Sequence, residues 1–254
     1  MAAKTSSNSP ASTVSFSKTP QAKNDVFGGY TEDSVLGNAS TISLDVMSND
    51  LGGNAKSLYS LSATADTASL ANRTVGSVTT SLGNTISIVG NTVGFKFGFD
   101  LNTLAQGEVY TDTFAYAIQL AGGTISWATA SVSITGNNDA PVISSETQLG
   151  GVIEDDAITA SGEVKATDVD NGAVLTYTGD ETGEYGSFDV AGKDGKWTYT
   201  LDNDNHQNLA QGESHTETFT VTVTDENGAS VTQDVTVTVD GKNDGPVAVA
   251  DTAI

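Results

Sequence analysis

The sequence predicts an all-β protein built from two tandem seven-stranded sandwich domains of immunoglobulin-like size in a linear array. Three observations lead to this prediction. From Asn24 onwards, apolar and polar residues alternate in short segments separated by Gly, Asn and Asp, and helical periodicity is absent. The chain repeats itself at a spacing of 105 residues. Such a unit has about the 100 residues of one seven-stranded sandwich.

Three pairs of matching segments define the repeat. LAQGE at 104–108 recurs at 209–213, TDTF at 111–114 recurs as TETF at 216–219, and Asn138-Asp139 recurs as Asn243-Asp244. Because all three pairs share one spacing, a chance match is implausible. The unit is too long for a solenoid repeat, which indicates separate domains.

The repeats divide the chain into four predicted segments. They are a flexible Ser/Thr-rich tail at 1–22, a divergent sandwich at 23–138, a second sandwich at 139–245, and the start of a further repeat or an exchanged strand at 246–254. Pro141 and Pro246 each come soon after an Asn-Asp pair. Proline has no amide donor and suits the first residue of an edge strand, so these positions are predicted to be domain joints.

Period-2 alternation marks the expected strands. In the second repeat they lie at 164–168, 175–177, 188–190, 197–201, 219–223 and 231–239, with a hairpin turn at 225–228. In the first repeat they lie at 42–46, 86–88, 95–99, 114–118 and 125–134. Trp127, Trp197 and the stripe Phe95, Phe97 and Phe99 are expected in the core rather than as sugar platforms. The stretch 62–74 fits either a loop or a short helix.

Composition excludes several classes of function. Ten Lys and Arg residues against 32 Asp and Glu give a net charge of −22, which argues against binding to nucleic acid or to anionic membranes. There is no cysteine, so metal ions or core burial must stabilise the fold. The chain has no run of 18 apolar residues, and its first 21 residues lack the apolar core of a cleaved signal peptide.

No catalytic motif was found. The two histidines, His206 and His215, do not have zinc-type spacing, and the sequence contains no nucleophile elbow, phosphate loop or dinucleotide fingerprint. Paired carboxylates are numerous enough for a glycosidase, but they fall at turns and linkers rather than in one cleft. We therefore expect a protein that is not an enzyme.

The acidic residues of two neighbouring sandwiches are expected to meet at the first joint. In a seven-stranded sandwich, the turn after the second strand and the last hairpin share one pole, while the turns after the first and fifth strands share the other. This topology brings together seven carboxylates and one amide: Glu32, Asp33, Asp100, Asn138, Asp139, Asp168, Asp170 and Asp225. Calcium takes six to eight oxygen ligands, and without a cation so many charges would raise one another's pKa.

A weaker group is expected at the second joint. It comprises Glu154, Asp155, Asp202, Asp204, Asn243 and Asp244, and it lacks the half that a third unit would supply. A group at the other end of the first repeat, around Asn24, Asp25, Asn49 and Asp50, is a less favourable calcium site than the first joint. The segment DVDNG at 168–172 is not an EF-hand because the bidentate Glu is missing. Taken alone, DENG at 225–228 fits an ordinary turn.

Several motifs together resemble the VCBS repeat of large bacterial surface and biofilm adhesins, often of the RTX type. They are IEDD at 153–156, ATDVDNG at 166–172, GKWTYTLDN at 195–203 and TDENG at 224–228. TED at 31–33 and VMSND at 46–50 make the first repeat similar to a related bacterial cadherin-like unit. The glycine-rich nonapeptide repeats of RTX proteins are absent from this chain.

The resemblance implies an extracellular, calcium-binding, adhesive or structural array, exported by a type I-like signal outside this chain. We expect a calcium-stiffened spacer whose partners are adjacent repeats of the same protein and matrix polysaccharide or other cell-surface components. Two alternatives stay open. One is a filament or surface-layer subunit that exchanges its C-terminal strand, and the other is a carbohydrate-binding module.

Overall fold

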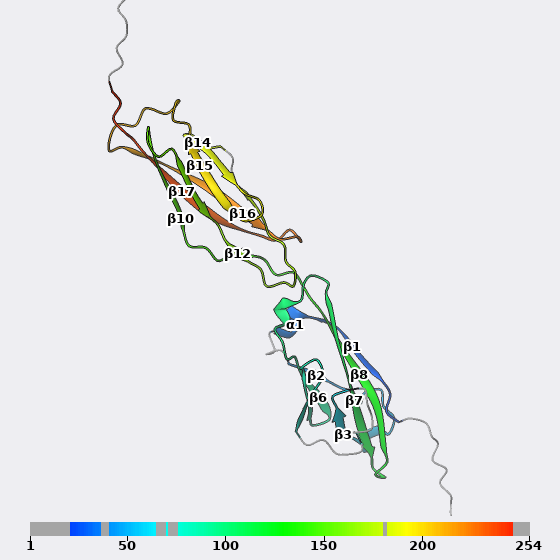
Figure 1. Ribbon diagram of the computed structural model, residues 1–254. Coiled ribbons are helices and arrows are strands. Elements are labelled where there is room, and N and C mark those ends of the chain that lie inside the picture. Colours follow the sequence, from blue (N-terminus) through cyan, green and yellow to red (C-terminus); the bar gives the residue numbers. More distant parts are fainter. Residues whose placement is uncertain (1–20, 37–40, 65–69, 71–75, 180–181, 246–254) are drawn as a thin grey trace, which may run out of the picture. The chain divides into compact units, whose positions relative to one another are not determined.

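A computed structural model describes residues 21–36, 41–64, 70, 76–179 and 182–245 (Figure 1). It confirms the predicted all-β class. The chain forms two compact units. The first comprises Met1–Gly28, Thr41–Phe99 and Thr111–Val132, and the second comprises Gly29–Ser40, Asp100–Tyr110 and Ser133–Ile254. The predicted segment 246–254, most of the predicted tail and part of the ambiguous stretch 62–74 lie outside the described residues.

The second repeat forms two main sheets. One has the strand order β10 (Gln148–Ile153), β17 (Ser230–Asp240), β16 (Ser214–Thr224) and β13 (Thr176–Gly179). The other has the order β11 (Thr159–Glu163), β15 (Lys196–Leu201) and β14 (Gly186–Val190), and a short pair joins β9 (Val142–Ile143) to β12 (Ala166–Thr167). β10 runs parallel to β17, whereas the other pairs are antiparallel.

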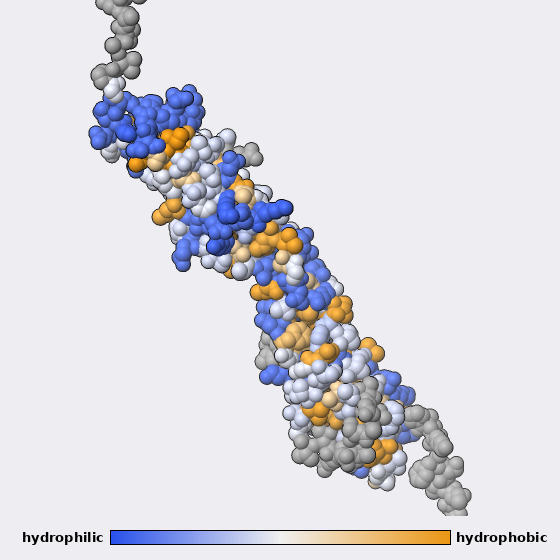
Figure 2. Space-filling model, in the orientation of Figure 1, coloured by the Kyte–Doolittle hydropathy of each residue, from blue (hydrophilic) through white to orange (hydrophobic). Residues whose placement is uncertain are grey.

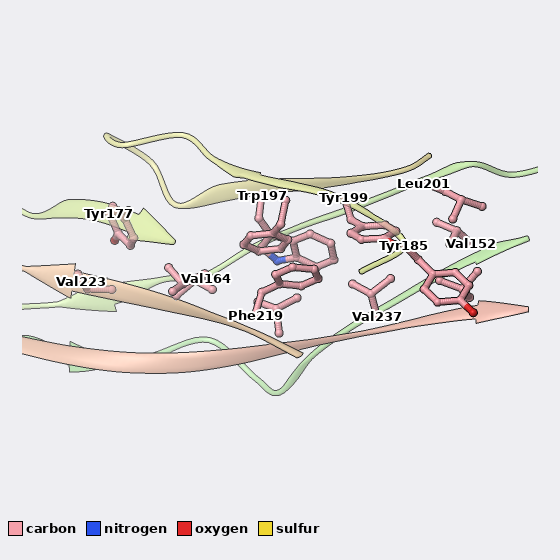
Figure 3. Packing of buried hydrophobic residues seen from close by; sticks show 14 residues of the cluster. Val152, Val164, Tyr177, Tyr185, Trp197, Tyr199, Leu201, Phe219, Val223 and Val237 are labelled. Atoms are coloured by element: carbon pink, nitrogen blue, oxygen red, sulfur yellow. The ribbon is translucent and has the colours of Figure 1, made fainter. Parts of the chain in front are cut away.

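Alternation along the strands builds the core of this repeat. Trp197, Tyr199 and Leu201 of β15 are buried at every second position, and they face Phe219 of β16 and Val237 of β17 (Figure 3). The Trp197 indole N–H donates to Gln148 Oε1 at 3.0 Å, which satisfies its buried polar atom. The predicted strands at 188–190, 197–201 and 219–223 and the hairpin at 225–228 are therefore confirmed.

The repeated LAQGE segment is a loop that docks on a glycine. Gly136 N donates to Glu108 O at 2.8 Å, and Gly241 N donates to Glu213 O at 2.9 Å. A Cβ on Gly136 would lie 2.3 Å from Leu104 O, and one on Gly241 would lie 2.5 Å from the equivalent Leu209 O. Both repeats thus need glycine just before the linker, because no side chain fits beneath the loop.

The first repeat also forms two sheets, each with four strands. One has the order β1 (Asp25–Thr31), β8 (Ile125–Thr135), β7 (Val109–Leu120) and β3 (Lys56–Ser62). The other has the order β2 (Thr41–Leu44), β6 (Thr92–Lys96), β5 (Thr85–Val89) and β4 (Ser77–Thr79). Between these strands lie the short helix α1 (Glu32–Leu36) and the 3₁₀ turns η1 (Gly53–Ala55) and η3 (Leu101–Thr103).

The expectation that both tryptophans are buried is wrong for one of them. Trp197 is 1% exposed, but Trp127 is 52% exposed. On β8 the even-numbered Ala128 and Ala130 face the core, so the odd-numbered Trp127 faces solvent. Two predicted strands end earlier than expected. Val46 lies in a turn after β2, and Phe97 and Phe99 lie beyond the end of β6.

Exposed apolar side chains occur on several strands and turns of the described residues, among them Val26, Leu82, Trp127, Leu149 and Val174. On the face shown in Figure 2, hydrophobic surface is interrupted by hydrophilic surface, and singly exposed apolar residues are normal for a folded protein. In the part of the chain that the structure describes, no helix has the length and apolarity needed to cross a membrane.

Candidate calcium site

The linker after β8, which begins at Gly136, forms hydrogen bonds to the first residues of α1. Asn137 donates its backbone N–H to Glu32 Oε1 at 2.7 Å and its side-chain Nδ2–H to Asp33 Oδ2 at 2.6 Å. Thr31 begins this helix with reciprocal bonds, because its N–H donates to Ser34 Oγ at 3.0 Å and its hydroxyl accepts from Ser34 N at 3.4 Å. The cap fixes α1, and α1 presents both acids to the linker.

The loop after β12 brings two more acids to the same linker. Asp168 Oδ1 accepts from the backbone N–H of Asp170 at 3.0 Å. Asp170 Oδ2 in turn accepts from the backbone N–H of Asp139 at 3.1 Å. Asn171 N donates to Thr103 O at 2.9 Å, which holds the loop against the last residue of η3.

The hairpin between β16 and β17 contributes Asp225. Its Oδ1 accepts from the N–H groups of Asn227 and Ala229, and its Oδ2 accepts from Asn138 Nδ2 at 2.8 Å. Burial acts to raise the Asp225 pKa, but the hydrogen bonds from Asn138 and the turn amides prevail and lower it. Asp225 is therefore held as a carboxylate that fastens the turn to the linker.

Four buried carboxylate oxygens of this group have no hydrogen-bond donor. They are Glu32 Oε2, Asp139 Oδ2, Asp168 Oδ2 and Asp170 Oδ1. Glu32 is 1% exposed and Asp170 is 6% exposed. A buried ionised oxygen without a partner is costly, so these four atoms need either protons or a cation.

The pKa values show that these acids act on one another. Burial raises the pKa of Glu32 to about 7, against the hydrogen bond from Asn137, and the charges of Asp139, Asp170 and Asp33 raise it further. The Asp139 pKa is raised by burial and then by Asp33, Asp168 and Asp100. For Asp170, burial is again the largest cause, and Asp168 and Asp139 add to it. The group thus holds more negative charge than its own hydrogen bonds offset.

The donor set fits calcium, because every free atom is a hard carboxylate oxygen. Across the described residues, no three Asp, Glu, His or Cys side chains already stand in a metal-coordinating arrangement. The unpartnered oxygens indicate where an ion would bind. In Glu32 and in Asp170, one carboxylate oxygen accepts a hydrogen bond from the linker and the second oxygen has no donor. Glu32, Asp139, Asp168 and Asp170 are the residues that would hold the ion.

The structure joins seven of the eight residues predicted for this site by hydrogen bonds, either to one another or through Asn137. Asp100 is the exception: it caps η3 by accepting from Asn102 N at 3.2 Å, and it affects the others only through its charge. Sequence reasoning missed three amide residues, Gln106, Asn137 and Asn227. Gln106 Oε1 accepts from Asn138 N at 3.0 Å, and Asn227 Nδ2 donates to Asn138 Oδ1 at 2.6 Å. Gln106 lies within the repeated LAQGE segment, so the repeat itself was a signal for it.

The weaker group is organised differently. Glu154 is fully buried, its Oε1 is unpartnered, and its Oε2 accepts from Lys242 N at 3.4 Å. The Lys242 ammonium donates to Asp155 O at 3.3 Å and lies 3.6 Å from Asp156. The other acids accept hydrogen bonds from asparagine side chains: Asp155 from Asn203 Nδ2, and Asp202 from Asn205 Nδ2. Asn243 Nδ2 donates to the backbone oxygen of Asp244. Asp204 and Asp244 are exposed.

An all-β sandwich with an acid-rich linker defines the class of protein, and comparison with known proteins specifies it further. Residues 138–241 match the family model of the bacterial cadherin-like domain, which confirms the expected resemblance to bacterial cadherin-like repeats. The sequence motifs indicate that family for the first repeat and the VCBS repeat for this segment, and the VCBS resemblance stays a prediction. A search of curated proteins found no match.

Solved structures of cadherin domains are among those similar to this chain. Cadherin domains 1–4 of protocadherin gamma B7 are 18% identical, with a TM-score of 0.43 over 89% of this chain and 51% of that chain. Mouse cadherin-23 EC22-24 is 16% identical, with a TM-score of 0.41 over 87% and 64% of the two chains. Drosophila N-cadherin EC1-3 is 16% identical, with a TM-score of 0.34 over 74% and 57%. The chain spans about half the length of the first of these structures.

Proposed function

We propose that this chain is a non-enzymatic adhesion or spacer module that binds calcium through Glu32, Asp139, Asp168 and Asp170. The observation that carries the proposal is the set of four buried carboxylate oxygens without a donor. A divalent cation would offset both the burial and the mutual repulsion that raise the pKa values of Glu32, Asp139 and Asp170. Asp33, Asp100, Asn138 and Asp225 would support the site by orienting the linker and adding negative charge.

The ion would connect the two sequence repeats. Glu32 belongs to the predicted domain 23–138, whereas Asp168 and Asp170 belong to the predicted domain 139–245. Calcium bound by acids from both repeats would stiffen the linker at Asn138-Asp139, as expected of a spacer in a bacterial surface or biofilm-matrix protein. Its partners would be adjacent repeats of the same protein.

Calorimetric titration with calcium tests the site. The wild-type chain is expected to bind calcium, and the double variant Asp168→Asn/Asp170→Asn is expected to bind at least about tenfold more weakly, because two charged ligands are lost. The matched control Asp189→Asn changes an exposed acid on β14 and should bind like the wild type. Heat signals that are absent from the wild type, or identical in the double variant, would refute the site.

Stiffening needs a separate measurement. Small-angle scattering is expected to show a narrower distribution of conformations with calcium than with a chelator. If the curves superimpose although calorimetry shows binding, the chain binds calcium without acting as a calcium-stiffened spacer.

A further inference from the structure

The first repeat carries a second buried acid group, built around Asp25 at the start of β1 and Asp50 in the turn after β2. Asp25 is 8% exposed and Asp50 is 7% exposed. Asp50 lies in the segment 46–50, which follows β2, and the Asp168–Asp170 loop follows β12, so each is an acidic loop directly after a strand. The two loops can therefore be compared directly.

The carboxylates of this second group have donors. The Asp50 Oδ1 accepts from Lys23 N at 2.7 Å, and the Tyr116 hydroxyl lies 2.8 Å from Asp25 Oδ2 and 3.1 Å from Asp50 Oδ1. Neither carboxylate is among the described side chains with a buried, unpartnered oxygen. This contrasts with Asp168 and Asp170, each of which leaves one oxygen unsatisfied.

A lysine supplies the positive charge. The Lys56 ammonium, from the first residue of β3, donates to Met47 O and to Asp50 O, both at 2.6 Å. Backbone carbonyl oxygens of an acidic loop are also typical calcium ligands. The Lys56 ammonium thus contacts the atoms of this turn that a metal ion would use.

The charges that face this group nearly balance. The negative groups are Asp25, Asp45 and Asp50, the positive groups are Lys23 and Lys56, and Tyr116 contributes one hydroxyl proton. Burial raises the pKa of Asp25 to about 6, and the Tyr116 hydrogen bond opposes this rise. Burial also raises the Asp50 pKa, against the bonds from Lys23 and Tyr116 and the charge of Lys56.

In contrast, no lysine of the described residues forms an ion pair with an acid of the candidate calcium site. The salt bridges found among the described residues pair lysines with Asp156, Glu163 and Asp194, and they include none of the four acids with unpartnered oxygens. The two buried acid groups therefore differ in their partners. The Asp25–Asp50 group has the Lys56 ammonium close by and donors from Tyr116 and Lys23, whereas the candidate calcium site keeps four oxygens without a donor.

We propose that Lys56 is the resident cation of the Asp25–Asp50 group, so that this group does not take calcium, and that the absence of such a lysine directs calcium to the Asp168–Asp170 group. The inference rests on the proposed calcium function. It identifies Lys56 as the residue that determines which of two similar loops responds to the ion.

Hydrogen–deuterium exchange of the full chain, read by mass spectrometry in calcium and in chelator, tests the inference. In the wild type, calcium should protect peptides that contain Asp168 and Asp170 and leave peptides from 46–50 unchanged. In Lys56→Met, peptides from 46–50 should exchange about tenfold faster in chelator, because two hydrogen bonds from a charged donor are lost. Calcium should restore their protection in this variant.

Two controls keep the outcome decisive. Lys96→Met removes an exposed lysine of the same repeat and should behave like the wild type. Lys56→Arg keeps the charge and should stay insensitive to calcium at 46–50, which also covers the case in which Lys56→Met does not fold.

The outcomes separate the two proposals. If calcium protects 46–50 in the wild type, or fails to restore protection there in Lys56→Met, Lys56 is not a resident cation. If calcium protects neither loop in the wild type, the proposed calcium function fails, whatever Lys56 does.

Discussion

Replacing Glu32 by Gln should change stability in opposite directions with and without calcium. In the folded chain the Glu32 pKa is raised from 4.5 to about 7, mainly by burial. A raised carboxyl pKa means that the folded state binds the proton more tightly than the unfolded state does. The stability that the Glu32 carboxyl contributes is therefore fully present below about pH 4.5 and is lost as the pH rises through about 7.

The magnitude follows from the shift of the pKa. A difference of about 2.5 pKa units corresponds to about 3 kcal/mol at pH 8, and the side chain is almost fully buried. Glutamine carries no charge, and its Oε1 can still accept from Asn137 N. In chelator at pH 8, Glu32→Gln should therefore raise the free energy of unfolding by about 2 to 3 kcal/mol, and at pH 4 the two proteins should be equally stable.

In calcium, Glu32→Gln should lower the free energy of unfolding instead of raising it. The ion stabilises the wild type by binding only the folded state, and the variant, which has lost a charged ligand, gains less from it. Urea denaturation with and without calcium, followed by Trp197 fluorescence in a Trp127→Phe background, measures both effects. Glu146→Gln, an exposed change in the same unit, is the control. If Glu32→Gln destabilises equally in both conditions, Glu32 is only a structural hydrogen-bond acceptor.

Three further predictions concern the rest of the chain. Because burial raises the Asp25 pKa from 3.8 to about 6, the stability that this carboxyl gives the first unit should fall by about 3 kcal/mol in all as the pH rises from about 3 to about 7. Asp25→Asn should abolish that slope in urea denaturation, and an unchanged slope would contradict the prediction. Gly136→Ala should cost about 2 kcal/mol in thermal unfolding because its Cβ would meet Leu104 O at 2.3 Å, whereas Gly122→Ala, with no atom within 4 Å, should cost little. Trp197→Ala should cost about 3 to 5 kcal/mol, and the exposed Trp127→Ala less than about 0.5 kcal/mol. Equal losses for the two tryptophans would show that Trp127 is covered.

The strands could be predicted because their signal is local. In β16 and β17, valine and phenylalanine alternate with threonine, so the period-2 pattern identifies both the strand and its buried face. The orientation of Trp127 could not be predicted in this way. The buried face of β8 near it carries only the small Ala128 and Ala130, so the largest side chain misleads a count of hydrophobic residues.

The acid group could be predicted because topology decides which turns share a pole. The amide residues that hold it could not, since Asn137 and Gln106 resemble ordinary loop residues until their distances to Glu32 and Asn138 are known. The role of Lys56 was equally hidden, because nothing in its sequence neighbourhood indicates that its ammonium reaches two carbonyl oxygens of the preceding turn. Calcium binding and the domain boundaries stay predictions.

The docking of the LAQGE loop on a glycine has a consequence for how such repeats can be recombined. Each loop and its glycine belong to the same repeat. The Glu108 carbonyl accepts a hydrogen bond from Gly136 N, and the Glu213 carbonyl accepts one from Gly241 N. A genetic exchange with its crossover at Pro141 would therefore carry each loop together with the glycine that fits it. Crossovers between 108 and 136 would instead combine parts from different parents, and only parents that share both features would yield a folded product.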